Sequence, residues 1–380
     1  MAKIVSFTLK GHKSSVNCLS YQNETSLLLS GSDDTTARLW DLRTSKASLC
    51  IRTDSPVTSV AFGKGPSKEE IVLSGPFAKN SSVFLGMEDD RILEYDLRQA
   101  GKPIVTEPTR DLTELFELDE EVNQISFSKN RIIAADDGGA VRLFSNDGGL
   151  TVLRDNSAPP FLMTCCSFRR TSDQLASGGT DCTLYYWDIR KPRKPLDSMC
   201  IPRDDDSAAV NQVCNPPMVH TLAWSPSGRL LASGLGDGTI EVVSIAKNKK
   251  FVHQSRLRNG HSNSVASLCF PNFGCGKRKS PDDRLLASIG TDGVIFLWDL
   301  NPTIGGRDAT DPAKILSKKL LELEEGKDGE FKDSNKKDPK ILFGIPHQAK
   351  GNWMVSNLTN SLFVADTTSE ITGYTIPLQH

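Results

Sequence analysis

Histidine, serine and aspartate recur in this sequence at spacings that would suit nucleophilic catalysis. A hydrolase triad uses a serine nucleophile, a histidine base and an aspartate that orients the histidine. Two sets share these types and their order: His12, Ser30 and Asp34, and later His261, Ser288 and Asp292. In each set a tryptophan, Trp40 or Trp298, follows six residues after the aspartate. A triad needs no tryptophan at a fixed spacing, so the pattern favours a structural hydrogen-bonded tetrad over a catalytic site.

Other signals of catalysis are weak or absent. Ser177, Asp181 and Trp187 repeat the spacing, but Asn156 stands where the histidine is expected. The glycine-rich run from Gly234 to Gly238 lies in an expected hairpin, and not in a strand-to-helix turn that binds phosphate. The sequence has no His-Glu-x-x-His, Walker, Gly-x-Ser-x-Gly or Cys-x-x-Cys motif. We therefore expect no enzyme, no cofactor and no metal site.

Arginine follows aspartate by two positions in three places. The pairs are Asp41 and Arg43, Asp96 and Arg98, and Asp188 and Arg190. A guanidinium group is planar and can make bidentate contacts to a carboxylate or to backbone carbonyls of a docked protein. We interpret these arginines as candidate protein-binding residues. The alternative interpretation is an ion pair within the same structural unit, or simple solvation.

A repeated unit positions all of these residues. It consists of an alternating apolar strand, a strand of small residues, an Asp/Gly turn and a strand that ends in an aromatic residue followed by Asp. The clearest copies end at Trp40, Trp187 and Trp298, and weaker copies end at Tyr95, Phe144, Val243 and Tyr374. A period of roughly 40–50 residues with a Trp-Asp dipeptide resembles that of WD-repeat β-propellers, in which each repeat forms a four-stranded blade. We therefore predict an all-β fold, a seven-bladed WD-repeat β-propeller.

The two ends of the chain complete the predicted ring. Residues 4–9 form an alternating segment before the first blade, whereas the last blade stops after the strand at residues 371–376. We predict that these N- and C-terminal strands pair and close the ring. Residues 305–340 contain nine basic and nine acidic residues, and we expect this insertion between blades six and seven to be disordered. The domain prediction is a single propeller over residues 1–380.

The overall charge balance argues against several classes of partner. The chain of 380 residues has 45 Lys+Arg and 47 Asp+Glu, whereas proteins that coat nucleic acid or anionic membranes need a basic excess. No signal-like segment and no apolar run long enough to span a membrane is present. The nine cysteines lie mostly in apolar runs, which is typical of free thiols in a reducing compartment. We expect cytoplasmic or nuclear residence, no membrane and no direct nucleic-acid binding.

The Trp-Asp-x-Arg pattern is similar to a box in WD-repeat substrate receptors of cullin-four RING ubiquitin ligases. The three matches are Trp40-Asp41-Leu42-Arg43, Tyr95-Asp96-Leu97-Arg98 and Trp187-Asp188-Ile189-Arg190. The resemblance implies that the Asp and Arg of each match face the damage-binding adaptor subunit, while the opposite face or loops recruit a substrate protein. Blade two departs from the box at Tyr95, and blade six has Asn301 in place of the arginine.

Three functional hypotheses therefore remain open. The first is a non-catalytic substrate receptor that links an unknown target protein to the ligase. The second is a scaffold of another multiprotein complex, in chromatin or signalling, in which the arginines are incidental. The third is a modified-peptide reader that uses the mouth of the central channel, and it predicts an acidic or aromatic cluster on that face.

Overall fold

The computed structural model describes most of the chain. The described residues are 4–23, 25–63, 82–99, 103–117, 120–128, 131–145, 149–155, 161–169, 172–203, 215–271, 273, 283–300 and 339–377. Apart from Pro339 and Lys340, the insertion expected at residues 305–340 lies outside the described residues, as does Asn156.

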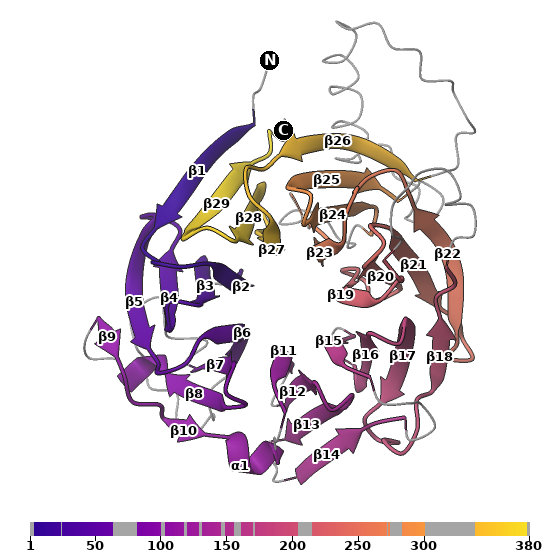
Figure 1. The fold of residues 1–380 in the computed structure, drawn as a ribbon, viewed down its shortest axis with the longest axis horizontal. Helices are drawn as coiled ribbons and strands as arrows, with labels where there is room; N and C mark the ends of the chain where they lie inside the picture. The colour runs from indigo at the N-terminus through magenta and orange to yellow at the C-terminus, as the bar shows by residue number, and fades with distance from the viewer. Residues whose placement is uncertain are drawn as a thin grey trace, which may run out of the picture.

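Seven sheets stand in chain order around a central opening (Figure 1). From the inside outwards, blade one contains β2 (Val16–Gln22), β3 (Leu27–Ser32), β4 (Thr36–Asp41) and β5 (Lys46–Arg52). Blade two contains β6 (Val57–Gly63), β7 (Ser82–Met87), β8 (Ile92–Asp96) and β10 (Arg110–Asp111). Blade three contains β11 (Val122–Ser128), β12 (Arg131–Asp136), β13 (Val141–Ser145) and β14 (Gly149–Leu153).

The remaining blades follow the same order. Blades four to seven contain β15 (Met163–Phe168), β16 (Gln174–Gly179), β17 (Thr183–Asp188) and β18 (Asp197–Cys200); β19 (Val219–Trp224), β20 (Leu230–Leu235), β21 (Ile240–Ile245) and β22 (Phe251–Leu257); β23 (Val265–Cys269), β24 (Leu285–Gly290), β25 (Val294–Asp299) and β26 (Lys340–Pro346); and β27 (Gly351–Ser356), β28 (Ser361–Asp366), β29 (Glu370–Thr375) and β1 (Val5–Lys10). The prediction of a seven-bladed, all-β propeller is confirmed.

The hydrophobic core lies between neighbouring blades. Every residue of the second strand is buried in blades one, five and six, because both faces of that strand are covered. Small residues in this strand allow close approach of the next blade. A Cβ on Gly31 would lie 2.5 Å from Cγ1 of Val57, and one on Gly178 would lie 2.4 Å from Cγ1 of Val219. The small-residue strand of the repeat is therefore a packing requirement of the ring.

A β-bulge occurs at the second residue of the innermost strand in every blade. The bulged residues are Asn17, Thr58, Asn123, Thr164, His220, Ala266 and Asn352. In five blades this side chain donates a hydrogen bond to the first backbone carbonyl of the next inner strand. Asn17 Nδ2, for example, lies 3.1 Å from the Val57 oxygen. Among the described residues, the bulged His220 makes no such hydrogen bond and the Ala266 side chain has no donor, so this hydrogen-bonded belt is interrupted after blades five and six.

The ring closes between its first and last described strands. β1 pairs with β29 in antiparallel register, from Val5 opposite Thr375 to Lys10 opposite Glu370. Apolar side chains of β1 and blade seven, including Leu9 and Phe363, pack with Trp40 of blade one in a single cluster. The predicted pairing of the N- and C-terminal strands is therefore present, and it carries core packing as well as backbone hydrogen bonds.

Blade two differs from the simple repeat. Its outer strand β10 has only two residues, and the chain before it forms β9 (Ile104–Val105), which pairs in parallel with β5 of blade one. Blade one therefore has five strands, one more than we predicted. The short helix α1 (Thr113–Phe116) follows β10, and a single 3-10 turn, η1 (Leu97–Gln99), follows β8.

Candidate protein-interaction site

Each Asp-x-Arg pair lies in the turn that follows the third strand of its blade. In blade one the backbone N–H of Arg43 donates to Asp41 Oδ1 at 3.0 Å, which fixes the turn. The guanidinium then folds back, and its Nε and Nη2 donate to Oδ1 and Oδ2 of Asp41 at 2.9 and 2.6 Å. The structure therefore shows the ion pair within the blade that was the alternative interpretation of the sequence.

The same turn is built in blades two and four. Arg98 donates to Asp96 through Nε at 3.0 Å and Nη2 at 2.6 Å. Arg190 donates to Asp188 through Nε at 3.0 Å and Nη2 at 2.9 Å, and Lys249 Nζ lies 3.4 Å from the same carboxylate. Three turns with one geometry thus present arginines at one end of the ring, which we call the arginine rim: Arg43, Arg98 and Arg190.

The ion pairs hold the carboxylates in the charged state. The hydrogen bond from Arg43 holds the pKa of Asp41 below its usual range. The corresponding hydrogen bond from Arg190, with help from Lys249, lowers the pKa of Asp188 to about 2. Burial would raise the pKa of Asp96, but the hydrogen bonds from Arg98 outweigh it and the pKa is lowered. Each arginine is therefore held in one orientation by a permanently ionised partner.

The three arginines differ in exposure and in position. The side chains of Arg43 and Arg190 are 60% and 64% exposed, whereas that of Arg98 is 29% exposed. Blades one and two are neighbours, but blade four lies beyond blade three (Figure 1). The structure thus brings Arg43 and Arg98 to adjacent blades and places Arg190 further round the same rim. Arg98, on the blade that departs from the box, is the least accessible of the three.

Blade six satisfies its terminal aspartate differently. Asn301, which stands where the arginine would be, lies outside the described residues. Arg284, next to the start of β24, donates from Nε to Asp299 Oδ1 at 3.2 Å and from Nη2 to Oδ2 at 2.5 Å. The Arg284 side chain is only 5% exposed, so this guanidinium supports the fold and is not presented on the surface.

The histidine and aspartate of each tetrad lie at the opposite end of the third strand, and the tryptophan reaches toward them from within that strand. His12 Nδ1 lies 3.0 Å from Asp34 Oδ2, and its Nε2 lies 2.7 Å from Ser30 Oγ. Trp40 Nε1 donates to the same Ser30 oxygen at 2.9 Å. His261, Ser288, Asp292 and Trp298 repeat this arrangement in blade six. We call this end of the ring the tetrad rim.

Burial explains why the tetrad is structural. Ser30 and Ser288 are both 0% exposed, and each hydroxyl is already engaged by a histidine and a tryptophan. A serine nucleophile must reach a substrate carbonyl, which these positions do not allow. Within the described ranges, no group of three metal-ligating side chains is close enough to hold a metal ion.

Blade four contains a modified network. Trp187 Nε1 donates to Ser177 Oγ at 2.9 Å, as in the complete tetrads. Asp181 instead accepts a hydrogen bond of 2.6 Å from the Tyr185 hydroxyl, and Tyr185 lies opposite Ser177 in the strand register. A tyrosine of the third strand therefore donates to Asp181, as histidine does to Asp34 and Asp292.

Blade seven contains a network that the sequence analysis missed. His347 Nε2 lies 2.8 Å from Asp366 Oδ2, and its Nδ1 lies 2.7 Å from the Tyr374 hydroxyl. His347 directly follows β26, as the histidine of Gly11-His12 closely follows β1. The signal available in the sequence was a histidine after an outer strand, followed by a third strand that ends in an aromatic residue. The aspartate of this network lies two places further from that aromatic residue than the aspartate of the tetrads does.

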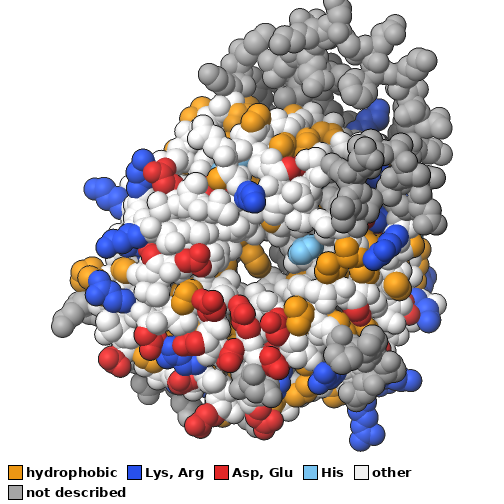
Figure 2. All heavy atoms as spheres, in the orientation of Figure 1, with side chains coloured by type: hydrophobic (Ala, Val, Ile, Leu, Met, Phe, Trp, Pro, Cys, Tyr) orange, Lys and Arg blue, Asp and Glu red, His pale blue; other side chains and the backbone are white. Residues whose placement is uncertain are grey.

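Acidic side chains gather on the tetrad rim beside the opening. Figure 2 shows them over blades two and three. Burial and then the charges of Asp137, Glu88 and Asp90 raise the pKa of Glu121, which places those three carboxylates within electrostatic reach of Glu121. The third hypothesis predicts an acidic or aromatic cluster on this face, and these residues are of that kind.

Comparison with known proteins agrees with the geometry. The family model of the WD domain, G-beta repeat, matches residues 4–41, 150–188 and 252–299, and the WD40 domain model of anaphase-promoting complex subunit 4 matches residues 209–271. These matches fall on the blades that the structure shows. The chain is a seven-bladed β-propeller that contains WD repeats. Proteins of this fold are typically non-catalytic interaction modules, which implies protein partners for this chain.

Several curated relatives share these repeats. The chain is 26% identical to a WD repeat-containing protein 53 homolog of Dictyostelium discoideum, over 97% of this chain and 93% of the relative. It is 33% identical to WD repeat-containing protein VIP3 of Arabidopsis thaliana over 34% of this chain and 39% of that protein. It is 44% identical to human WD repeat-containing protein 18 over 20% of this chain and 15% of that protein.

Among the described residues, no helix is long and apolar enough to cross a membrane.

Proposed function

We propose that this propeller is a non-catalytic substrate receptor that docks the damage-binding adaptor of a cullin-four RING ubiquitin ligase through its arginine rim. The observation that carries the proposal is the repeated Asp-x-Arg turn, in which a buried or half-buried aspartate orients an exposed guanidinium. An ion pair that only supported the blade would not need the arginine at the surface, as Arg284 of blade six shows.

The geometry leaves each guanidinium able to bind a partner. Arg43 uses Nε and Nη2 for Asp41, and an arginine has five N–H donors. Because Nη1 lies on the other edge of the planar group, it can donate to a carboxylate or backbone carbonyl of a docked protein. The guanidinium is already ordered, so docking costs little side-chain entropy. Arg43 and Arg190 carry the proposal, and Arg98 makes the smaller contribution because it is less exposed.

The test is an affinity measurement with the purified adaptor and the wild-type chain. We expect wild type to bind and the double variant Arg43→Ala/Arg190→Ala to lose most of that binding, with an unchanged thermal midpoint. Arg91→Ala is the matched control, because Arg91 is also paired with aspartates, Asp89 and Asp54, but lies in the turn between β7 and β8 on the tetrad rim. Absence of binding by wild type, or equal binding by the double variant, would contradict the proposal and favour the scaffold hypothesis.

The second candidate is a reader of basic peptides at the channel mouth. The acidic residues around Glu121 favour it, since lysine and arginine side chains would find complementary charge there. Replacing Glu88, Asp90 and Glu121 by the corresponding amides would abolish such binding and leave adaptor binding intact. Loss of substrate capture with retention of the adaptor would place the substrate site on this face.

A further inference from the structure

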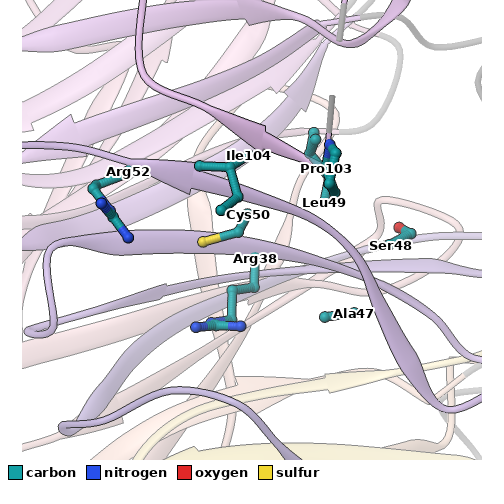
Figure 3. Close-up of a pocket in the computed structure, with 8 residues that line it drawn as sticks. All are labelled: Arg38, Ala47, Ser48, Leu49, Cys50, Arg52, Pro103 and Ile104. Atoms are coloured by element: carbon teal, nitrogen blue, oxygen red, sulfur yellow. The ribbon is translucent and has the colours of Figure 1, made fainter. Parts of the chain in front are cut away.

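A cleft of about 260 Å³ opens on the outer side of blade one (Figure 3). It lies where β9 adds to β5. Its lining includes Arg38 of β4, Cys50 and Arg52 of β5, and Ile104 of β9. Figure 3 shows the Arg38 and Arg52 side chains directed to the same end of the cleft. No function considered so far uses these residues.

The strand register explains why these side chains meet. Cys50 lies opposite Arg38 in the antiparallel pair and opposite Ile104 in the parallel pair. Directly opposed residues in neighbouring strands project from the same face of a sheet, and so do residues two apart in one strand. Arg52 is two residues after Cys50, so Arg38, Cys50, Arg52 and Ile104 share one face. The arrangement exists only because the chain of blade two returns to pair with blade one.

The cleft has an uncompensated positive charge. No ion pair of Arg38 or Arg52 occurs within the described part of the chain, whereas Arg284 of blade six and the three arginines of the arginine rim are each paired with an aspartate. Arg38 Nε is buried and has no hydrogen-bond acceptor among the described residues. Gly11 makes room for this guanidinium, since a Cβ there would lie 3.1 Å from Arg38 Nη1. A buried, unsatisfied donor on a charged group is costly, and native structures contain few of them.

We propose that this cleft binds the phosphoryl group of a phosphorylated side chain on a partner protein. Two guanidinium groups match the double negative charge and the several acceptor oxygens of a phosphate ester. Ile104 and Pro103 provide an apolar wall for the carbon atoms of the bound side chain. The cleft opens at the outer edge of the blade, so an extended peptide can present such a side chain without entering the ring. The proposal is independent of adaptor docking, because no residue is shared with the arginine rim.

The test uses fluorescein-labelled peptide libraries with a central phosphoserine flanked by mixed alanine, glycine and serine. Matched libraries carry serine or glutamate at the centre. Fluorescence anisotropy with the full chain should show binding of the phosphoserine library and weaker or no binding of the other two. Arg52→Gln should weaken binding by about tenfold, because one charge-assisted contact is lost. Arg229→Gln is the control, since Arg229 of blade five is exposed and paired with Asp283 of blade six.

A second readout locates the ligand. Bound phosphopeptide should slow alkylation of Cys50, measured by mass spectrometry of the peptide that contains it, and should leave the exposed Cys200 unaffected. Arg38→Gln/Arg52→Gln should abolish both binding and protection, and the exposed Arg52→Gln alone serves if the double variant fails to fold. Equal binding of the serine or glutamate library, binding that survives loss of both arginines, or unchanged alkylation of Cys50 would each overturn the proposal.

Discussion

At the scale of single residues, Ser30 is the centre of the blade-one network. Its hydroxyl contacts both His12 Nε2 and Trp40 Nε1 in a fully buried position. We predict that Ser30→Ala lowers the free energy of unfolding by about 1–3 kcal/mol, because two buried polar groups lose their partner. Ser177→Ala should lower the free energy of unfolding by less, since among the described residues only Trp187 loses a hydrogen-bond partner. Urea denaturation measures both, and equal losses would contradict the account.

The aspartates of these networks predict a dependence of stability on acid pH. Burial would raise the pKa of Asp34, but hydrogen bonds from His12 and Thr36 lower it overall. A carboxyl group with a lowered folded-state pKa stabilises the fold above its unfolded-state pKa of about 4, and this stabilisation is lost as the pH falls through the folded-state value.

We therefore expect the urea midpoint of the wild-type chain to fall as the pH is lowered from about 6 to about 3. Asp34→Asn removes one contributing carboxyl group, so its midpoint should change less over the same range, although the variant is less stable at neutral pH. Parallel curves for the two proteins would show that Asp34 does not contribute to the acid sensitivity.

At the scale of elements, the bulged residues of the inner strands link one blade to the next. We predict that Asn17→Ala lowers the free energy of unfolding by about 1 kcal/mol, because its amide bridges to the Val57 carbonyl and to Asp33. Ala266→Asn, at the interrupted part of the belt, should raise stability by a smaller amount. Thermal denaturation compares the variants, and a loss of stability in Ala266→Asn would show that blades six and seven do not use this link.

The sequence predicts the strands better than it predicts contacts that depart from the repeat. The ends of the third strands could be read from the aromatic-Asp pattern, because that pattern recurs at similar intervals. The pairing of β9 with β5 could not, since a strand of two residues carries no repeat pattern that would indicate its partner. His347 escaped notice for a related reason: the aspartate that it contacts does not occupy the usual position in its strand.

At the scale of the whole molecule, closure of the ring depends on β1. This strand pairs with β29 over six residues, and Leu9 is 1% exposed. We predict that deletion of residues 1–10 lowers the thermal midpoint by about 10 °C or more, since it removes core contacts and exposes the edge of blade seven. A synthetic peptide of residues 4–10 should restore part of the loss when added to the truncated chain. An unchanged midpoint after deletion would contradict closure by this strand.

The whole-molecule fold and the site differ in how far sequence alone can predict them. Seven copies of a repeat determine the number of blades, because each copy must bury its faces against a neighbour. The positions of Arg43, Arg98 and Arg190 on one rim follow from that repeat. Their ion pairs are local and were the alternative interpretation of the sequence. Their unequal exposure and the acidic group around Glu121 depend on contacts between turns, which a linear pattern does not specify.

We propose that the arginine rim faces the adaptor, and site-specific photo-cross-linking can test this orientation. A photoreactive residue is placed at Thr44, next to Arg43, and in a second protein at Ser262, an exposed residue on the tetrad rim. The account predicts that the adaptor of the cullin-four ligase cross-links from position 44 and not from position 262. Cross-linking from position 262 alone, or from neither position while other proteins are captured at position 44, would contradict it.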